Sequence, residues 1–142
     1  RGYPQIFTGD EIFAVSRDLS QGHGGLRVEF DDNWAEDPVK KDIHDYTRTL
    51  LRWRKTSDAV HNGKTLHFLS RDNTYAFFRY TDDEAVFVYL NNNTEPRRIP
   101  WEEYSEITAT LGKDAHDVLS GEKADPASLT AAPKSAVILE FK

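Results

Sequence analysis

Thr74-Tyr75-Ala76-Phe77-Phe78-Arg79-Tyr80 and Ala85-Val86-Phe87-Val88-Tyr89-Leu90 decide how this chain folds. Both stretches are rich in β-branched and aromatic residues, which favour strands. The turn formers of residues 81–84 separate them, and a third stretch of this kind spans residues 136–141. Short strands with such punctuation predict antiparallel hairpins that form a β-sandwich.

The regions around these stretches extend the same pattern. Residues 66–69 predict a further strand, and the turn formers of residues 71–73 and 91–93 bound the hairpins. Weaker strands are expected around residues 98–99, 105–110 and 116–119. Residues 121–135, which contain two prolines, predict a polar loop.

The first third of the chain has a different character. Gln5-Ile6-Phe7-Thr8 lies between Pro4 and Gly9 and predicts a short buried strand. Residues 16–37 are polar, with three glycines close to His23, and predict a long loop of the kind that often has a function.

A helix is expected over residues 38–55. Apolar residues recur there at intervals of four and three positions, which places them on one helix face. Pro38 suits the first helical position, Asp37 suits the cap, and basic residues at the far end match the helix dipole.

The chain therefore divides near residue 57, into residues 1–56 and an all-β domain of residues 57–142. A single strand, loop and helix cannot satisfy the edges of the strand or bury both of its faces. Residues 1–56 are therefore expected to be the tail of a larger α/β fold.

Composition narrows the classes of function. The chain has 142 residues, a net charge of −6 and no cysteine. A nucleic-acid surface needs a basic face, and a membrane span needs about 18 uninterrupted apolar residues, so neither partner is expected. The five histidines show no metal-ligand spacing, and no metal or cofactor is expected.

A family resemblance lies at the start of the chain. Gly2-Tyr3-Pro4-Gln5-Ile6-Phe7-Thr8-Gly9-Asp10-Glu11 resembles the last barrel-strand motif of the alpha-amylase family, glycoside hydrolase family 13. Leu26-Arg27-Val28-Glu29-Phe30-Asp31-Asp32-Asn33-Trp34 is similar to a stretch of its neopullulanase and cyclomaltodextrinase branches, with Glu29 in place of Asp. Residues 117–122 and 135–140 are also typical of the family, so the resemblance covers nearly the whole chain.

This resemblance implies a fold class, and it implies that the catalytic residues lie outside this chain. The fold class is the last strand, loop and helix of a (β/α)8 barrel, followed by an antiparallel β-sandwich as the C-terminal domain. Retaining glycoside hydrolysis needs two carboxylates about 5–5.5 Å apart. The family motifs that supply them would precede Arg1, and no carboxylate among residues 10–32 matches them. No catalytic residue is therefore expected in this chain, which should not hydrolyse glycosides by itself.

The resemblance also implies a place where substrate binds. Loops at the C-terminal ends of barrel strands build the active site, so residues 9–37 would edge the sugar groove. Arg27 matches a family arginine that binds a glucose unit, but His23 stands where the family has Asp. The competing interpretation is that Arg27 pairs only with Glu29 or Asp31 and that His23 is an ordinary loop residue.

The aromatic side chains and Glu11 have mainly structural interpretations. Glu11 is expected to brace the base of the loop, while Phe30 and Trp34 anchor the loop and Trp53 lies in the core. Trp101 is the best surface aromatic of the β domain and the candidate contact to starch.

Three functions remain open from the sequence. The chain is the C-terminal region of an alpha-amylase-type hydrolase, a separate β-sandwich that binds starch, or a purely structural lid. The expected partners are an α-glucan oligosaccharide, bound through the parent enzyme, and the remainder of the barrel. A second copy of the chain is a candidate partner, and the periplasm is slightly favoured over the cytoplasm.

Overall fold

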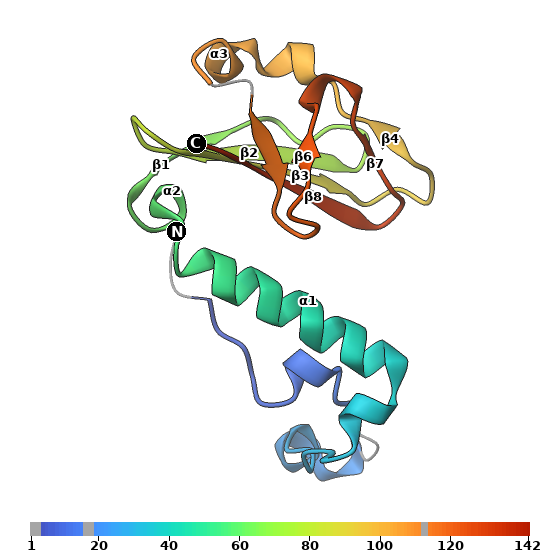
Figure 1. Ribbon diagram of the computed structural model, residues 1–142. Coiled ribbons are helices and arrows are strands. Elements are labelled where there is room, and N and C mark those ends of the chain that lie inside the picture. The colour runs from blue at the N-terminus through green and yellow to red at the C-terminus, as the bar shows by residue number, and fades with distance from the viewer. Residues whose placement is uncertain (1–3, 16–18, 112–113) are drawn as a thin grey trace. The chain divides into compact units, whose positions relative to one another are not determined.

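The computed structural model describes residues 4–15, 19–111 and 114–142 (Figure 1). Residues 1–3 of the amylase-like motif and residues 16–18 at the start of the expected loop lie outside this described part. The chain forms two compact units, residues 1–51 and residues 52–142.

The first unit consists of short 3-10 segments and most of one α-helix. The 3-10 segments are η1 (Asp10–Ile12), η2 (Leu19–Leu26) and η3 (Trp34–Glu36). The expected strand at residues 5–8 is not formed, because no other strand lies beside these residues in the described part of the chain. A strand needs partners for its backbone N–H and C=O groups. The barrel strand is thus not observed.

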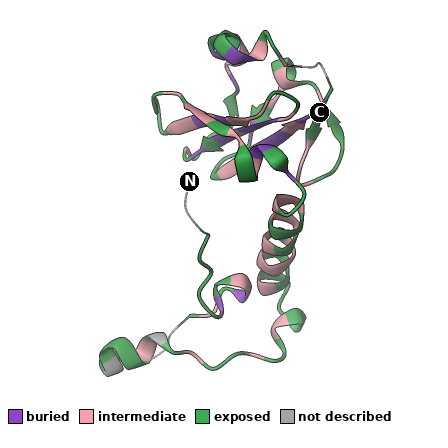
Figure 2. Cartoon of the chain, turned by 90° about the vertical axis from the view of Figure 1, so that its left-hand side faces the viewer, coloured by how far each residue is buried: buried purple, intermediate pink, exposed green. Residues whose placement is uncertain are grey.

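The predicted helix over residues 38–55 is confirmed as α1 (Pro38–Arg54). The Asp37 carboxylate accepts hydrogen bonds from the backbone N–H groups of Val39 and Lys40, at 2.9 and 3.3 Å. Two of the N–H groups that a helix start leaves unpaired are thereby satisfied. No residue of α1 is buried, as Figure 2 shows.

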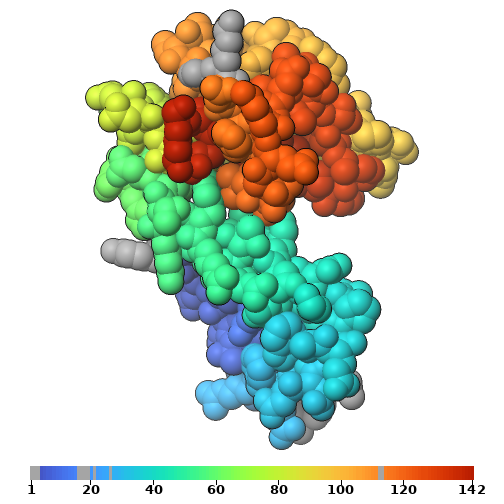
Figure 3. All heavy atoms as spheres, in the orientation of Figure 1, coloured from blue at the N-terminus to red at the C-terminus, as the bar shows by residue number. Residues whose placement is uncertain are grey.

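The second unit is built on a six-stranded antiparallel sheet. Its strands lie in the order β1-β2-β3-β8-β5-β6, so that β5 pairs with the end of β8. In Figure 3 the orange region of the chain lies against the dark red C-terminal end. The strands are β1 (Lys64–His67), β2 (Thr74–Tyr80), β3 (Ala85–Asn91), β5 (Ala115–Asp117), β6 (Lys123–Ala124) and β8 (Ser135–Phe141). The three stretches that predicted strands thus form its centre.

Turn chemistry sets the two hairpins that join β1, β2 and β3. Asp72 and Asn73 have φ of 48° and 56°, the conformation that a tight two-residue hairpin turn requires. In the next turn, the Thr81 hydroxyl accepts hydrogen bonds from the N–H groups of Asp83 and Glu84, at 3.3 and 3.1 Å. The expected turns at residues 71–73 and 81–84 are confirmed.

Helical segments and a small second sheet cover one face of the large sheet (Figure 1). They are η4 (Trp101–Tyr104), α3 (Ser105–Thr108), η5 (Pro126–Ser128) and the pair β4 (Arg97–Arg98) and β7 (Thr130–Ala131). The domain is therefore a β-rich antiparallel sheet with few helices, and the second layer of the expected sandwich is largely helical.

Two expectations about this covering layer are wrong. Residues 105–110 form no strand: α3 begins at Ser105, and Tyr104 and Ile107, three positions apart, both reach the core. Trp101 is half-buried rather than a free surface aromatic, with its ring centroid 5.1 Å from that of Phe87 and 5.8 Å from that of Phe141. Aromatic packing holds this layer on the sheet.

The core lies between the sheet and its covering layer. Phe78, Phe87, Ile99 and Leu139 have no exposed surface there. Residues 121–135, expected as a loop, contribute β6 to the large sheet, and η5 and β7 to the covering layer. No helix among the described residues has the length and apolar character that crossing a membrane requires.

The second helix of the chain, α2 (Asp58–Asn62), lies on the opposite face of the sheet from the core. Gly63 follows it, and a Cβ there would lie 2.3 Å from the carbonyl oxygen of Ala59, so the close approach of the chain to α2 requires glycine.

Candidate functional site

The segment expected to edge a sugar groove begins with a turn at Gly9. This residue has φ of +97°, and a Cβ on it would lie 2.7 Å from the Cβ of Ala14, so only glycine fits. The Glu11 carboxylate accepts a hydrogen bond from the Gly9 N–H at 3.0 Å, and Asp10 accepts one from the Phe7 N–H at 2.9 Å. The bracing role expected for Glu11 is confirmed.

The chain then returns close to this turn. The backbone N–H of Arg27 donates to the carbonyl oxygen of Gly24 at 3.0 Å, which closes the turn after η2. A Cβ on Gly9 would lie only 3.6 Å from Cγ2 of Val28, so the two ends of the segment 9–28 are neighbours. The segment 9–28 is thus a loop that is closed at its base, where Val28 approaches Gly9.

His23 and Arg27 both lie on this closed loop, and both are exposed. No hydrogen bond or ion pair joins their side chains within the described part of the chain. Asp31, one of the two carboxylates considered as a partner of Arg27, forms an ion pair with Lys40 at 2.5 Å. The binding roles of His23 and Arg27 stay predictions.

The end of the loop is fixed to the start of α1. The rings of Trp34 and His44 have centroids 4.2 Å apart, and the Lys40–Asp31 ion pair joins the same two segments. Trp34 is half-buried, as expected for an anchor of the loop, whereas Phe30 is 45% exposed.

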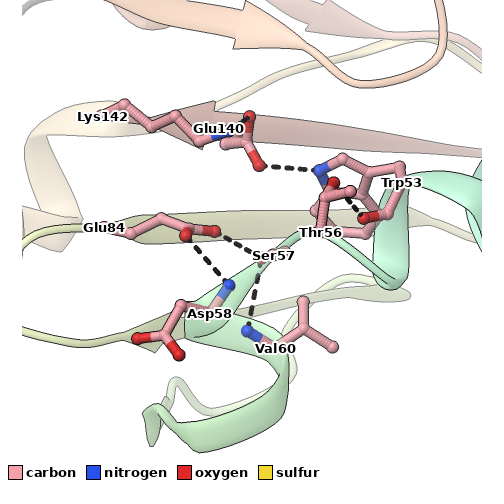
Figure 4. A network of polar contacts seen from close by, with 8 residues as sticks. All are labelled: Trp53, Thr56, Ser57, Asp58, Val60, Glu84, Glu140 and Lys142. Atoms are coloured by element: carbon pink, nitrogen blue, oxygen red, sulfur yellow. Dashed lines mark hydrogen bonds and ion pairs between the residues drawn. The ribbon is translucent and has the colours of Figure 1, made fainter.

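A second group of polar contacts joins Trp53 and the first residues of α2 to the sheet (Figure 4). The indole Nε1 of Trp53 donates to Oε1 of Glu140 on β8 at 2.8 Å, and Nζ of Lys142 donates to Oε2 of the same carboxylate at 2.8 Å. The hydrogen bond to Glu140 raises the pKa of Lys142. Glu140 is therefore shared between the helix end and the C-terminal residue of the chain.

Ser57 forms the next contact with the sheet. Its side chain is fully buried, caps α2 by accepting the Val60 N–H at 3.3 Å, and donates to Oε1 of Glu84. The other oxygen of Glu84 accepts the Asp58 N–H at 3.0 Å. One carboxylate of the β2–β3 turn thus satisfies two donors at the start of α2.

Arg79 of β2 adds further contacts to this junction between the sheet and α2. Its Nε donates to the Ala59 carbonyl oxygen at 3.2 Å and its Nη2 to that of Val60 at 3.0 Å. The roles of Glu84, Glu140 and Arg79 are not visible in the sequence, because nothing in a strand pattern indicates a partner so distant in the chain.

The second unit also has an open cavity of about 530 Å³. It lies between the β2–β3 turn and α3, and its walls include Tyr80, Glu84, Ile107, Phe141 and Lys142. Neither His23 nor Arg27 lines it. No cluster of three or more His, Asp or Glu side chains suited to a metal ion occurs in the described residues.

The fold of the second unit matches a known domain family. The family described as the cyclo-malto-dextrinase C-terminal domain matches residues 65–140, which is more than half of the chain. The search among curated proteins finds no match.

Solved structures share the fold at low sequence identity. AmyP in complex with maltose is 16% identical with a TM-score of 0.57, over 73% of this chain and 21% of that protein. Maltogenic amylase from S. marinus is 14% identical with a TM-score of 0.53, over 73% of this chain and 15% of that protein. The trehalulose synthase MutB from Pseudomonas mesoacidophila MX-45 is 22% identical with a TM-score of 0.53, over 81% of this chain and 22% of that protein.

The chain therefore spans about a fifth of the length of these proteins, or less. These matches confirm the resemblance to the alpha-amylase family that the opening motif indicated. By the match of residues 65–140, the chain belongs to the cyclomaltodextrinase C-terminal domain family.

Proposed function

We propose that this chain is the C-terminal portion of an α-glucan-hydrolysing enzyme of the alpha-amylase or neopullulanase type. It supplies one loop of the substrate groove and a stabilising β domain, and it has no hydrolytic activity by itself. The observation that carries the proposal is the family match over residues 65–140, which assigns the β domain to a C-terminal domain family.

The architecture of the first unit supports this proposal. The helix α1 is amphipathic, yet it has no buried residue, and Val39 and Tyr46 of its apolar face are 56% and 44% exposed. An amphipathic helix gains most of its stability from packing its apolar face. Such a face suits a helix whose packing partners belong to a larger barrel.

The proposed role of Arg27 is to bind a sugar unit. The guanidinium has five N–H donors in a fixed arrangement that suits neighbouring sugar hydroxyls. Its exposure and the closed base of its loop support this role, because a ligand group needs a free side chain on a fixed backbone. His23, four positions earlier on the same loop, is the proposed second contact to the sugar.

The test uses the longer enzyme with an α-glucan oligosaccharide. Arg27→Ala is expected to lower kcat/KM about 10-fold, which equals about 1.4 kcal/mol of lost transition-state binding. His23→Ala should have a smaller effect in the same direction. Arg97→Ala, which removes an exposed arginine of β4, is the matched control and should leave kcat/KM unchanged. An unchanged kcat/KM in Arg27→Ala would overturn the role of the loop.

The alternative of a stand-alone starch-binding module has less support. Its candidate contact, Trp101, packs against four rings of the core, including those of Phe78 and Tyr104. In affinity electrophoresis through amylopectin, the 142-residue chain is expected to migrate without retardation. Clear retardation would favour the binding module.

A further inference from the structure

The open cavity between the β2–β3 turn and α3 has no part in the proposed function. All of its lining residues belong to the second unit, so its shape does not depend on where the first unit lies. Its volume of about 530 Å³ falls within the usual range of ligand pockets, about 300–1,000 Å³. The cavity therefore has room for a short peptide segment or a small organic molecule.

Much of the lining of this cavity is apolar and held in place. Ile107 and Phe141 are buried members of the core, and Leu66 and Leu111 are half-buried against it. The half-buried Tyr80 adds an aromatic side chain from β2. The hydrocarbon part of a ligand would gain free energy by leaving water for this surface.

Carboxylates line the cavity from two sides. Asp82 and Asp83 belong to the β2–β3 turn, and Glu106 belongs to α3. All three residues are exposed, and within the described part of the chain their side chains form no hydrogen bond or ion pair. Three negative charges therefore face the cavity without a positive partner among the described residues.

The hydrogen-bond donors of the lining are mostly engaged within the protein. The hydroxyls of Thr81 and Thr110 donate to backbone carbonyl groups of their own turns, at 3.4 and 2.8 Å. The ammonium of Lys142 donates to Glu140 at 2.8 Å (Figure 4). Among the described side chains of the lining, the Tyr80 hydroxyl is the one donor without such a bond. The cavity thus offers acceptors and negative charge, and it suits a ligand that is rich in donors.

These features favour an organic cation over a neutral sugar. A carboxylate that a neutral ligand covers loses hydration and gains no opposite charge in exchange. Sugar hydroxyls also accept hydrogen bonds, and few donors are available to them here. An arginine side chain has five N–H donors, no acceptor, and an aliphatic stem that lies well on apolar surface. A metal ion is disfavoured, because the described residues contain no suitable cluster of ligands.

We propose that this cavity binds a basic, arginine-containing segment of a partner protein. The aliphatic stems contact Leu66 and Leu111, and the guanidinium groups pair with the carboxylates of Asp82, Asp83 and Glu106. Charge complementarity selects this occupant, since arginine pairs with carboxylates through two parallel hydrogen bonds. A second copy of the chain is a poor candidate, because it would bring two net charges of −6 together.

The test uses a defined peptide and isothermal titration calorimetry. The peptide is a tetrapeptide of alternating leucine and arginine, blocked at both ends, and it is titrated into the 142-residue chain and into the longer enzyme. Saturable binding to both proteins is expected. The same peptide with citrulline in place of arginine keeps the shape but loses the charge, and it should bind at least ten-fold more weakly. Equal binding of the two peptides would overturn the proposal.

Variants of the chain locate the site. Asp83→Asn combined with Glu106→Gln removes one charge from each side of the cavity and should weaken binding at least ten-fold. Glu95→Gln combined with Glu122→Gln is the matched control, because it removes two exposed carboxylates outside the cavity. The control should change the affinity less than two-fold. Equal weakening by the two pairs would show attraction to the net charge alone and would overturn the proposal.

Other occupants of the cavity give other results. Binding of the peptide to the 142-residue chain but not to the longer enzyme would show that the rest of the enzyme covers the cavity, and would overturn the proposal. Displacement of the peptide by maltotriose would assign the cavity to a sugar. The absence of saturable binding up to about 1 mM peptide would also refute it. Hydrolysis of α-glucans is measured separately, so the proposed function and this site succeed or fail independently.

Discussion

Trp53 donates a hydrogen bond from its indole Nε1 to Oε1 of Glu140 at 2.8 Å, which joins two residues 87 positions apart. The donor stands at the end of α1 and the acceptor stands on β8, a central strand of the sheet. Lys142 binds the second oxygen of the same carboxylate. Trp53 is thereby joined to β8 by a half-buried, charge-assisted contact within the second unit.

Removal of the indole donor tests the strength of this contact. Trp53→Phe is expected to lower the free energy of unfolding by about 1–2 kcal/mol, because the ring remains while a hydrogen bond to a charged group is lost. Urea denaturation of the 142-residue chain measures the change. In a double-mutant cycle with Glu140→Ala, which removes the acceptor, a coupling energy near zero would contradict the assigned bond.

The cap of α2 gives a second prediction. Ser57→Ala should lower the free energy of unfolding by about 1–2 kcal/mol, because it removes the cap and one partner of Glu84. The matched control is Ser128→Ala, whose exposed hydroxyl donates to the nearby Asp125 carbonyl oxygen at 3.1 Å. The control should stay within about 0.5 kcal/mol, and equal losses in the two variants would show that Ser57 has no special role.

The two units should respond differently to the loss of a phenylalanine. Phe78 is fully buried among the rings of the core, whereas Phe13 of the first unit is 58% exposed. Phe78→Ala is expected to cost about 3–5 kcal/mol, or to prevent folding of the sheet. Phe13→Ala should cost less than about 0.5 kcal/mol in the 142-residue chain. Urea denaturation followed by circular dichroism measures the stability of both variants. Equal losses of stability in Phe78→Ala and Phe13→Ala would contradict the prediction.

Tyr104 predicts how the domain responds to alkali. Burial, with smaller contributions from Tyr89 and nearby glutamates, raises the pKa of Tyr104 from 10 to about 12. Below pH 10 the phenol is protonated in both states, so its contribution to stability is fully present. As the pH rises from 10 to about 12, the unfolded state loses the proton first, and stability falls by up to about 2–3 kcal/mol.

Tyr104→Phe is the control for this titration. The variant keeps the ring in the core but has no phenol to ionise, so its stability should decline less between pH 9.5 and about 12. Urea midpoints at a series of pH values give the comparison. Parallel declines in the wild type and in Tyr104→Phe would contradict the assignment to Tyr104.

The centre of the sheet and the long helix were predictable because their signals are local. The β-branched and aromatic runs of β2, β3 and β8 specify strands, and Asp72 and Asn73 specify the turn between β1 and β2. The cap at Asp37 and the apolar spacing after it specify α1. In each case the residues that decide the structure lie within a few positions of one another.

The errors arose where the outcome depends on distant partners. Residues 5–8 have a strand-like composition, but a strand forms only beside another strand, and the described chain offers none there. Residues 105–110 contain β-formers, yet the packing of Tyr104 and Ile107 against the rings of the sheet favours a helix. At residues 5–8 the missing partner strand decided the outcome, and at residues 105–110 tertiary contacts overrode the local preference.

The candidate site likewise combines features that the local sequence predicted with contacts that it could not predict. Arg27 and His23 came from a family motif, and the turn at Gly9 and the brace at Glu11 followed from local chemistry. The junction through Glu84, Arg79 and Glu140 could not be predicted, since its partners lie 19 to 87 positions apart.

The central claim is that this chain belongs to an α-glucan hydrolase whose catalytic carboxylates lie elsewhere in the protein. The most direct measurement is the release of reducing ends from starch, pullulan and cyclodextrin by the 142-residue chain, beside the same assay of the longer enzyme. The account predicts release by the longer enzyme and none above the buffer rate by the chain. Sustained hydrolysis by the 142-residue chain alone would contradict it.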